Sequence, residues 1–420
     1  MLSVFRSAAK ISDLRQRIIF TLLMFAIFRL GVFIPVPGVN HEVLENLFRG
    51  GTLFGLLDLF AGGALRKFSI FAMNVTPYIN ASIIIQLLTI VIPRLEQLSK
   101  EGEEGRRKIV QYTRYGTVIL GLVQALGMSI GLARQGALLR SGITPVLVIA
   151  ITLTAGTAFL MWLGEQITEK GIGNGISLLI FAGIVSRLPE GMARIFSMLR
   201  AGTITIFNLF LLTVAGLLVI AAVVWITEGQ RKIPVNYAKR VVGRRMYGGQ
   251  STHLPLRINT AGVIPVIFST SILAFPVTLA QFIQHPVVQK AASFLSFTGP
   301  AYNVLNFLLI IFFTYFYTAI TFNPSDVADN IKKYGGFIPG IRPGRPTAEY
   351  LDRVLTRITL VGAVFLATIA VMPNFFQGLT NIPNLYFGGT ALLIVVGVAL
   401  ETMKQIEAHI IMRHYQGFIR

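Results

Sequence analysis

The chain contains no cysteine, and acidic residues are scarce: 18 of its 420 residues are Asp or Glu, against 37 Lys and Arg. The absence of cysteine excludes disulfides, thiolate metal sites and cysteine nucleophiles. Only 13% of the residues are charged, which is about half the share of an ordinary globular domain. Because 54% of the residues are hydrophobic, the composition predicts a polytopic membrane protein.

Ten apolar runs account for most of this hydrophobicity. They are 18–37, 70–92, 115–133, 145–164, 176–196, 204–227, 261–284, 303–322, 358–376 and 386–403. Most of them reach the roughly 20 residues that a membrane-spanning helix needs. The first run has no small-residue cleavage site after it, so we expect no removable signal peptide. Ten spans would put both termini on one side of the membrane.

The basic residues are distributed unevenly between the two sides that these spans define. The segments on the side of the termini carry 27 Lys and Arg, whereas the opposite segments carry 9. Short basic loops stay in the cytoplasm, so both termini are predicted to be cytoplasmic. The net charge of +19 has two interpretations: an orientation signal, or an acidic partner such as RNA at the cytoplasmic face.

The sequence offers no set of residues for catalysis within the predicted spans. The five histidines lie in loops or the tail, no HExxH or GxSG pattern occurs, and we expect no metal, no cofactor and no enzymatic activity. The nearest approach to a nucleotide motif, GIGNG at 171–175, lacks a following Lys-Ser/Thr and is interpreted as a tight cytoplasmic turn. No carboxylate lies mid-span, because Glu165 and Glu401 fall near span ends; this disfavours a coupled transporter. Arg29 is the one charge well inside a run, and we expect it to pair with a polar neighbour or to snorkel.

The two halves of the chain contain similar motifs in corresponding spans. A division near residue 200 gives two sets of five spans, which must then be inverted relative to each other. The second and seventh spans both contain V-x-P-x-I, at 75–79 and 263–267. We expect each proline to lie inside its span and to free a backbone carbonyl. The fifth span is interrupted after ten residues by Ser186, Arg187, Pro189 and Glu190, which is typical of a segment lining a cavity.

Side-chain amides lie in the second and third spans and at the entrance to the seventh. They are Asn74, Asn80, Gln86, Gln124 and Asn259. Two interpretations stay open: ordinary hydrogen bonds between helices, or a polar seam that is able to part.

The segment LFGLLDLFAGGAL at 53–65 is apolar but short. As a helix it would cover only about 20 Å of a hydrocarbon core about 30 Å thick, so it is too short to span the membrane. By composition alone it is interpreted as a re-entrant helix at the external interface.

Several stretches of the sequence carry a resemblance to a known family. They are FIPVPG (33–38), FAGGAL (60–65), PYINASIIIQLLT (77–89), EGEEGRRKIVQYTRYGT (101–117), MWLGEQITEKGIGNGIS (161–177), NYAKR (236–240), QSTHLPLRINTAGVIP (250–265), ADNIKKYGGFIPGIRPG (328–344) and YFGGTALLIVV (386–396). They resemble the SecY family, the pore-forming subunits of the bacterial Sec protein-translocation channel. The stretches follow one another from the first span to the tenth, and several are polar.

The resemblance implies an all-α polytopic membrane protein with ten transmembrane helices. These would form two inverted, pseudo-symmetric five-helix halves, 1–200 and 201–420, around a central pore, with a short plug helix at about 53–67. It also implies a constriction, the pore ring, made of six aliphatic side chains. They are Val75, Ile79, Ile176, Ile180, Ile267 and Ile394. Such a ring dewets when narrow and has no fixed charge that would select one substrate sequence.

Three further sites follow from the resemblance. The plug would comprise Leu57, Asp58, Leu59, Phe60, Ala61, Gly62, Gly63, Ala64 and Leu65. A lateral gate would contain Asn80, Gln86, Gln124 and Asn259. The loops at about 228–257 and 323–357 would dock a motor or the ribosome through Lys239, Arg240, Arg244, Arg245 and Arg342.

The expected function is therefore to pass unfolded secretory polypeptides across the bacterial cell membrane and to release transmembrane segments sideways. The implied partners are the small membrane subunits SecE and SecG, the SecA motor ATPase, the ribosome, signal sequences and the lipid bilayer. The alternative is an inverted-repeat secondary transporter of a small solute, which the missing mid-membrane carboxylate disfavours.

Overall fold

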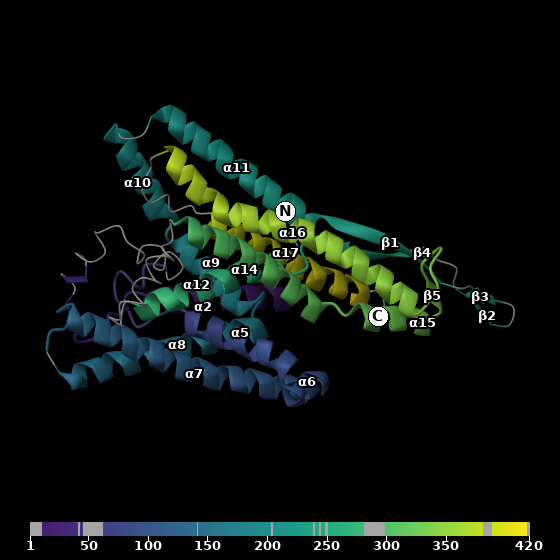
Figure 1. Cartoon of the computed structure of the whole chain (residues 1–420), viewed down its shortest axis with the longest axis horizontal. Coiled ribbons are helices and arrows are strands. Elements are labelled where there is room, and N and C mark those ends of the chain that lie inside the picture. Colours follow the sequence, from purple (N-terminus) through teal and green to yellow (C-terminus); the bar gives the residue numbers. More distant parts are fainter. Residues whose placement is uncertain are drawn as a thin grey trace.

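The computed structural model describes residues 11–40, 43–44, 62–140, 142–202, 205–237, 240–242, 245–247, 251–280, 299–380 and 389–417. The chain is largely helical over this part (Figure 1). The helices are α2 (Ser12–Gly31), α5 (Thr76–Val91), α6 (Pro93–Lys100), α7 (Glu103–Arg134), α8 (Ile143–Lys170), α9 (Gly175–Ser186), α10 (Leu188–Arg200), α11 (Ile206–Glu228), α12 (Ile264–Ala280), α14 (Pro300–Thr321), α15 (Pro324–Lys333), α16 (Arg345–Thr380) and α17 (Gly389–Gly417).

Each of the ten apolar runs coincides with a helix over most of its described length. Six helical segments of the described chain are long and apolar enough to cross a membrane, and a seventh qualifies if α5 and α6 count as one span. These two helices meet at an angle of 101°. Ile92 is extended between them and Pro93 opens α6, which suits a residue that precedes proline. Multiple apolar spans are therefore confirmed, whereas the number ten stays a prediction.

The helices pack side by side as a bundle (Figure 1). Helices α7 and α8 contact each other along one edge of the bundle, and α11 and α16 lie at the opposite edge. The largest apolar cluster lies between them and takes buried residues from α2, α5, α9, α12 and α17. The core therefore joins elements from both ends of the sequence.

The predicted loops at about 228–257 and 323–357 contain strands that the sequence analysis did not foresee. Strand β1 (Gln230–Tyr237) pairs antiparallel with both β4 (Ser251–Arg257) and β5 (Gly336–Phe337), which gives the order β4-β1-β5. The short strands β2 (Arg240–Val242) and β3 (Arg245–Tyr247) pair with each other. Ile233, Leu256 and Leu351 share a small apolar core, so the two loops pack together on the start of α16.

The two V-x-P-x-I motifs begin helices, so the expectation of prolines inside spans is wrong. Val75 is the N-cap residue of α5 and Pro77 lies in its first turn. Pro265 is likewise the second residue of α12. Proline is tolerated there because the first N–H groups of a helix have no intrahelical partner. Residues 70–75, assigned to the second span, form turns in which Asn74 has a φ of 52°.

Two of the apolar runs are not continuous helices. Helix α9 ends at Ser186 and α10 starts at Leu188, which confirms the predicted break in the fifth run. Helix α2 ends at Gly31, where a Cβ would lie 2.0 Å from the ring of Phe71. The first run was extended to residue 37, but residues 32–37 are not helical.

Candidate functional site

The structure brings the six predicted pore-ring residues into one apolar cluster. Val75, Ile79, Ile180, Ile267 and Ile394 are buried members of it, and Ile176 is partly buried against it. They come from α5 with its N-cap, α9, α12 and α17. The six residues, dispersed over more than 300 positions of sequence, therefore belong to or pack against the same apolar core.

A cavity of about 340 Å³ adjoins this cluster. Ile79, Ile176, Ile180 and Ile267 line it, together with residues of α7 and with Tyr317 of α14. Its wall thus combines branched alkyl groups with polar side chains. Val75 and Ile394 are not among the lining residues.

Sequence reasoning assigned no role to several polar residues that line this cavity. They are Tyr78, Ser82, Arg106, Thr113, Asn174, Ser177 and Tyr317. Asn174 is the N-cap of α9, where its side chain accepts hydrogen bonds from the N–H groups of Ile176 and Ser177. An N-cap Asn fixes the start of a helix, so the GIGNG turn sets the position of the first ring residue on α9. The Asn at that position was the signal that could have revealed this role.

Three of the predicted gate amides, Asn80, Gln124 and Asn259, are buried, and Gln86 is half-buried. Helix α12 contacts both α5, which carries Asn80 and Gln86, and α7, which carries Gln124. Asn259 precedes α12 and donates to the carbonyl of Gly262 at 3.1 Å. Gln86 also lines the cavity. No hydrogen bond between two of these four amides is found among the described residues, so they do not form a bonded cluster.

Only the end of the predicted plug, Gly62–Leu65, lies within the described residues, whereas 57–61 lie outside them. Gly62 and Gly63 adopt φ values of 63° and 89°, in turns rather than a helix. A Cβ at Gly62 would lie 2.9 Å from the Cα of Gly183 on α9. Glycine therefore permits this segment to approach α9 closely.

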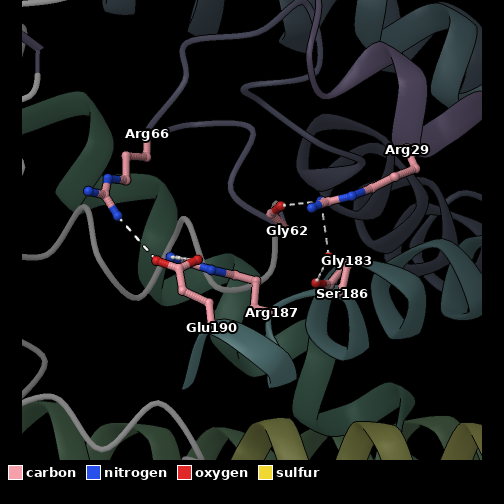
Figure 2. A network of polar contacts seen from close by, with 7 residues as sticks. All are labelled: Arg29, Gly62, Arg66, Gly183, Ser186, Arg187 and Glu190. Atoms are coloured by element: carbon pink, nitrogen blue, oxygen red, sulfur yellow. Dashed lines mark hydrogen bonds and ion pairs between the residues drawn. The ribbon is translucent and has the colours of Figure 1, made fainter. Parts of the chain in front are cut away.

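Arg29 holds the same segment in place, as Figure 2 shows. Its guanidinium donates to the carbonyl of Gly62 at 3.0 Å and to the hydroxyl of Ser186 at 3.2 Å. On the other side of this segment, Arg66 pairs with Glu190 of α10 at 3.3 Å. The expectation that Arg29 pairs with a polar neighbour is confirmed, and the break between α9 and α10 supplies that neighbour.

The predicted docking residues are only partly described. Lys239 and Arg244 lie outside the described residues, and Arg240 and Arg245 lie on β2 and β3, where only their backbone is described. Arg342 is exposed, and its carbonyl accepts a hydrogen bond from Thr347 at 2.8 Å. That bond ties the loop to the first turn of α16.

Comparison with known proteins assigns the family. The sequence profile of the SecY family matches residues 69–403. The chain belongs to the SecY family. It is 53% identical to the protein translocase subunit SecY of Halalkalibacterium halodurans, with 98% of each chain covered. Its identity to the subunit of Bacillus subtilis is 50%, again over 98% of each chain.

Solved structures of SecY-type channels share the fold. A protein-conducting channel superposes with a TM-score of 0.67 at 20% identity, covering 94% of this chain and 92% of the other. The Sec61 channel of the canine ribosome-channel complex gives 0.64 at 18% identity, with the same coverage. Membership of the SecY family supports a protein-conducting channel in the membrane, and it gives no support to the solute transporter. SecY is a family of channel subunits rather than of catalysts.

Proposed function

We propose that this chain is the central channel subunit of a protein translocase, which passes unfolded polypeptides across the cell membrane and releases apolar segments sideways into lipid. The observation that carries the proposal is full-length similarity at 53% identity to a protein translocase subunit. Ten spans in two inverted halves, 1–200 and 201–420, with both termini in the cytoplasm, complete the proposed architecture.

The pore ring is proposed as the constriction. Its six members are aliphatic and belong to or pack against one cluster, so a narrow passage among them would exclude water and ions. A translocating chain would part the same side chains without meeting a fixed charge. The ring is thus suited to many substrate sequences.

The lateral gate is proposed between α12 and the pair α5 and α7. A segment exposed there partitions by composition, because Leu gains about 0.3 to 0.6 kcal/mol and a charged residue loses about 2.5 to 3.5 kcal/mol at a helix centre. Buried amide atoms of Asn80, Gln86, Gln124 and Asn259 have no hydrogen-bond partner among the described residues. Such atoms weaken the closed contact, which favours opening by a hydrophobic signal sequence.

The proposed partners follow from the family and from the basic loops. SecE and SecG would pack against the spans, and SecA or the ribosome would dock at Arg342 and the neighbouring basic residues. Canine Sec61 and yeast Ssh1, two channels of the same fold, occur in complexes with ribosomes. The chain has no nucleotide motif in its sequence, so the energy for transport is proposed to come from such a partner.

Reconstitution tests the proposed function. Proteoliposomes that contain the complex purified with this chain should protect a signal-bearing precursor from added protease when SecA and ATP are present. Liposomes without the complex provide the control. Uptake of a small solute with no protection of the precursor would instead support the transporter.

The plug is proposed to seal the resting channel from the external side. Deletion of residues 57–65 should therefore raise the ion conductance of the resting complex in planar bilayers. Without the plug, the aliphatic ring is the remaining barrier to ions. The intact complex, measured in the same bilayers, is the control. Equal conductance in the deleted and intact channels would contradict the plug assignment.

A further inference from the structure

The side chain of Ile176, one of the pore-ring residues on α9, packs against a glycine of α8. A Cβ at Gly164 would lie 2.5 Å from Cδ1 of Ile176 and 3.2 Å from its Cγ1. A real Cβ essentially never comes within 3.0 Å of such an atom, so a larger residue at 164 would displace the end of the isoleucine side chain. Gly164 itself is buried in α8. The position of Ile176 therefore depends on a glycine at 164.

A threonine hydroxyl joins the backbones of the same two helices. The hydroxyl of Thr168 on α8 donates to the carbonyl of Gly164 at 2.9 Å and accepts from the N–H of Gly175 at 2.9 Å. Gly175 is the first residue of α9, where N–H groups have no intrahelical partner. A Cβ at Gly175 would overlap the same carbonyl oxygen of Gly164. The backbone of α8 is thus in contact with the first turn of α9, which carries Ile176.

Ile176 also lies at the cavity beside the pore ring. As far as the chain is described, the wall of this cavity includes Ile176 but no residue of α8. An isoleucine displaced from Gly164 would therefore move toward the other ring residues that line the cavity, which are Ile79, Ile180 and Ile267. Protein interiors are close-packed, and added volume forces neighbouring side chains apart. A methyl group at 164 would therefore disturb the packing of the ring.

A second glycine supports ring residues of the other half. A Cβ at Gly397 of α17 would overlap Cγ1 of Val263. Val263 is 3% exposed, and its carbonyl accepts a hydrogen bond from the N–H of Ile267 at 3.2 Å. Gly397 also lies about one turn after Ile394 on α17. This glycine therefore determines how closely the start of α12 approaches α17, beside two ring residues.

Other helical glycines of the chain lack such contacts. Glycine in membrane helices commonly serves close packing of helices in general. The nearest atoms to a Cβ at Gly121 of α7 are 3.8 and 3.9 Å away, and at Gly216 of α11 no described atom lies within 4 Å. At Gly164 and Gly397, by contrast, the added Cβ would meet a pore-ring residue or a residue bonded to one.

We propose that Gly164 and Gly397 are positioning residues of the pore ring, which determine how closely its aliphatic side chains approach one another. Gly164, with the hydroxyl of Thr168, holds Ile176 against α8. Gly397 holds Val263 against α17 and, through it, positions Ile267. A larger residue at either position would push ring side chains apart, and the gap would admit water and ions. The inference rests on the proposed role of the ring as the constriction.

A double-mutant cycle tests the contact at Gly164 in the purified complex. Gly164→Ala should raise the resting ion conductance in planar bilayers above that of the natural complex. In a channel that carries Ile176→Val, the same substitution should have no further effect, because valine lacks the Cδ1 atom that the added Cβ would meet. Gly216→Ala is the matched control and should leave the conductance at the natural level.

The second glycine and the hydroxyl extend the test. Gly397→Ala should likewise raise the resting conductance, and it should add nothing in a channel with Val263→Ala, which lacks the Cγ1 atom. Thr168→Val removes both hydrogen bonds between α8 and the start of α9 and should also raise the conductance. Thr168→Ser keeps the hydroxyl and should conduct less than Thr168→Val.

The outcomes decide the inference separately from the proposed function. Natural conductance of Gly164→Ala and Gly397→Ala, with natural amounts of inserted complex, would overturn it. A rise of the same size with and without Ile176→Val would do so too, because the glycine would then act at another place. If Gly164→Ala does not accumulate, the double variant with Ile176→Val must accumulate and seal, and its failure refutes the inference.

A substitution in the ring itself separates the two levels of the account. If Ile79→Ser combined with Ile267→Ser leaks while both glycine variants seal, the positioning role is wrong and the constriction stands. If that ring variant seals, the constriction fails and the positioning role fails with it.

Discussion

The double variant Ile79→Ser and Ile267→Ser is expected to make the resting channel leak ions. Both side chains are buried, line the cavity and belong to the aliphatic cluster. A narrow apolar constriction excludes water because the wall offers no hydrogen bonds, and two hydroxyls in that wall would restore them. We expect the conductance of the purified complex in planar bilayers to rise clearly above that of the natural complex, because the constriction no longer dewets.

A control on the same helix distinguishes the ring from general damage. Ile84 also lies on α5, but 45% of it is exposed. Ile84→Ser introduces the same hydroxyl away from the ring and should leave the conductance near the natural level. If it leaks as much as the ring variant does, the assignment of the constriction is wrong.

Charge reversal at Arg342 is expected to stop export driven by SecA while the chain stays folded and inserted. Arg342 is exposed in a loop that a hydrogen bond from Thr347 ties to α16. A rigid cation at a protein interface pairs with an acidic partner, so Arg342→Glu replaces attraction by repulsion, which costs several kcal/mol for like charges in contact. Precursor protection in proteoliposomes measures the loss.

Arg345 provides the matched substitution. Its side chain is 90% exposed and pairs with Glu349 on the same helix. Surface pairs of this kind contribute little to stability, so Arg345→Glu should export at close to the natural rate if docking depends on Arg342. Normal export by Arg342→Glu, with the amount of inserted protein unchanged, would refute the docking role.

Hydrophobicity located the spans well because a helix in lipid must be apolar along its length. Hydrophobicity did not predict where the helices begin and end, because single residues determine these positions. Gly31 is the last residue of α2, and the ring of Phe71 occupies the space that a Cβ there would need. The prolines of the two V-x-P-x-I motifs begin α5 and α12 instead of interrupting them. The length of an apolar run reveals neither a contact from a distant element nor the residue at which a helix begins.

The strands were missed for a different reason. Strand β1 contains Pro234 and pairs with β4, which contains Pro255, and proline within a run argues against a strand. Its other neighbour, β5, lies about a hundred residues away and is two residues long. Such pairing depends on tertiary contacts, and the alternation in which β1 buries Ile233 and Val235 is short and contains Pro234.

Some residues of the candidate site could be predicted from the sequence alone, and others could not. Arg29 stood out because a lone charge in an apolar run needs a partner, and its bonds to Gly62 and Ser186 bear this out. The six ring residues have no chemical signature apart from being aliphatic, so the resemblance to the family was needed to select them. The cavity-lining Arg106 and Tyr317 come from helices that only the tertiary fold brings together.

The most direct test of the account is to locate a chain in transit. A stalled, signal-bearing secretory chain carrying one cysteine would be combined with channels that have Ile79→Cys or Ile267→Cys, and oxidised. The proposed pore predicts disulfide adducts at both positions and none with Ile84→Cys on the exposed side of α5. Absence of adducts at 79 and 267, in complexes shown to complete translocation when released, would contradict the assignment of the pore.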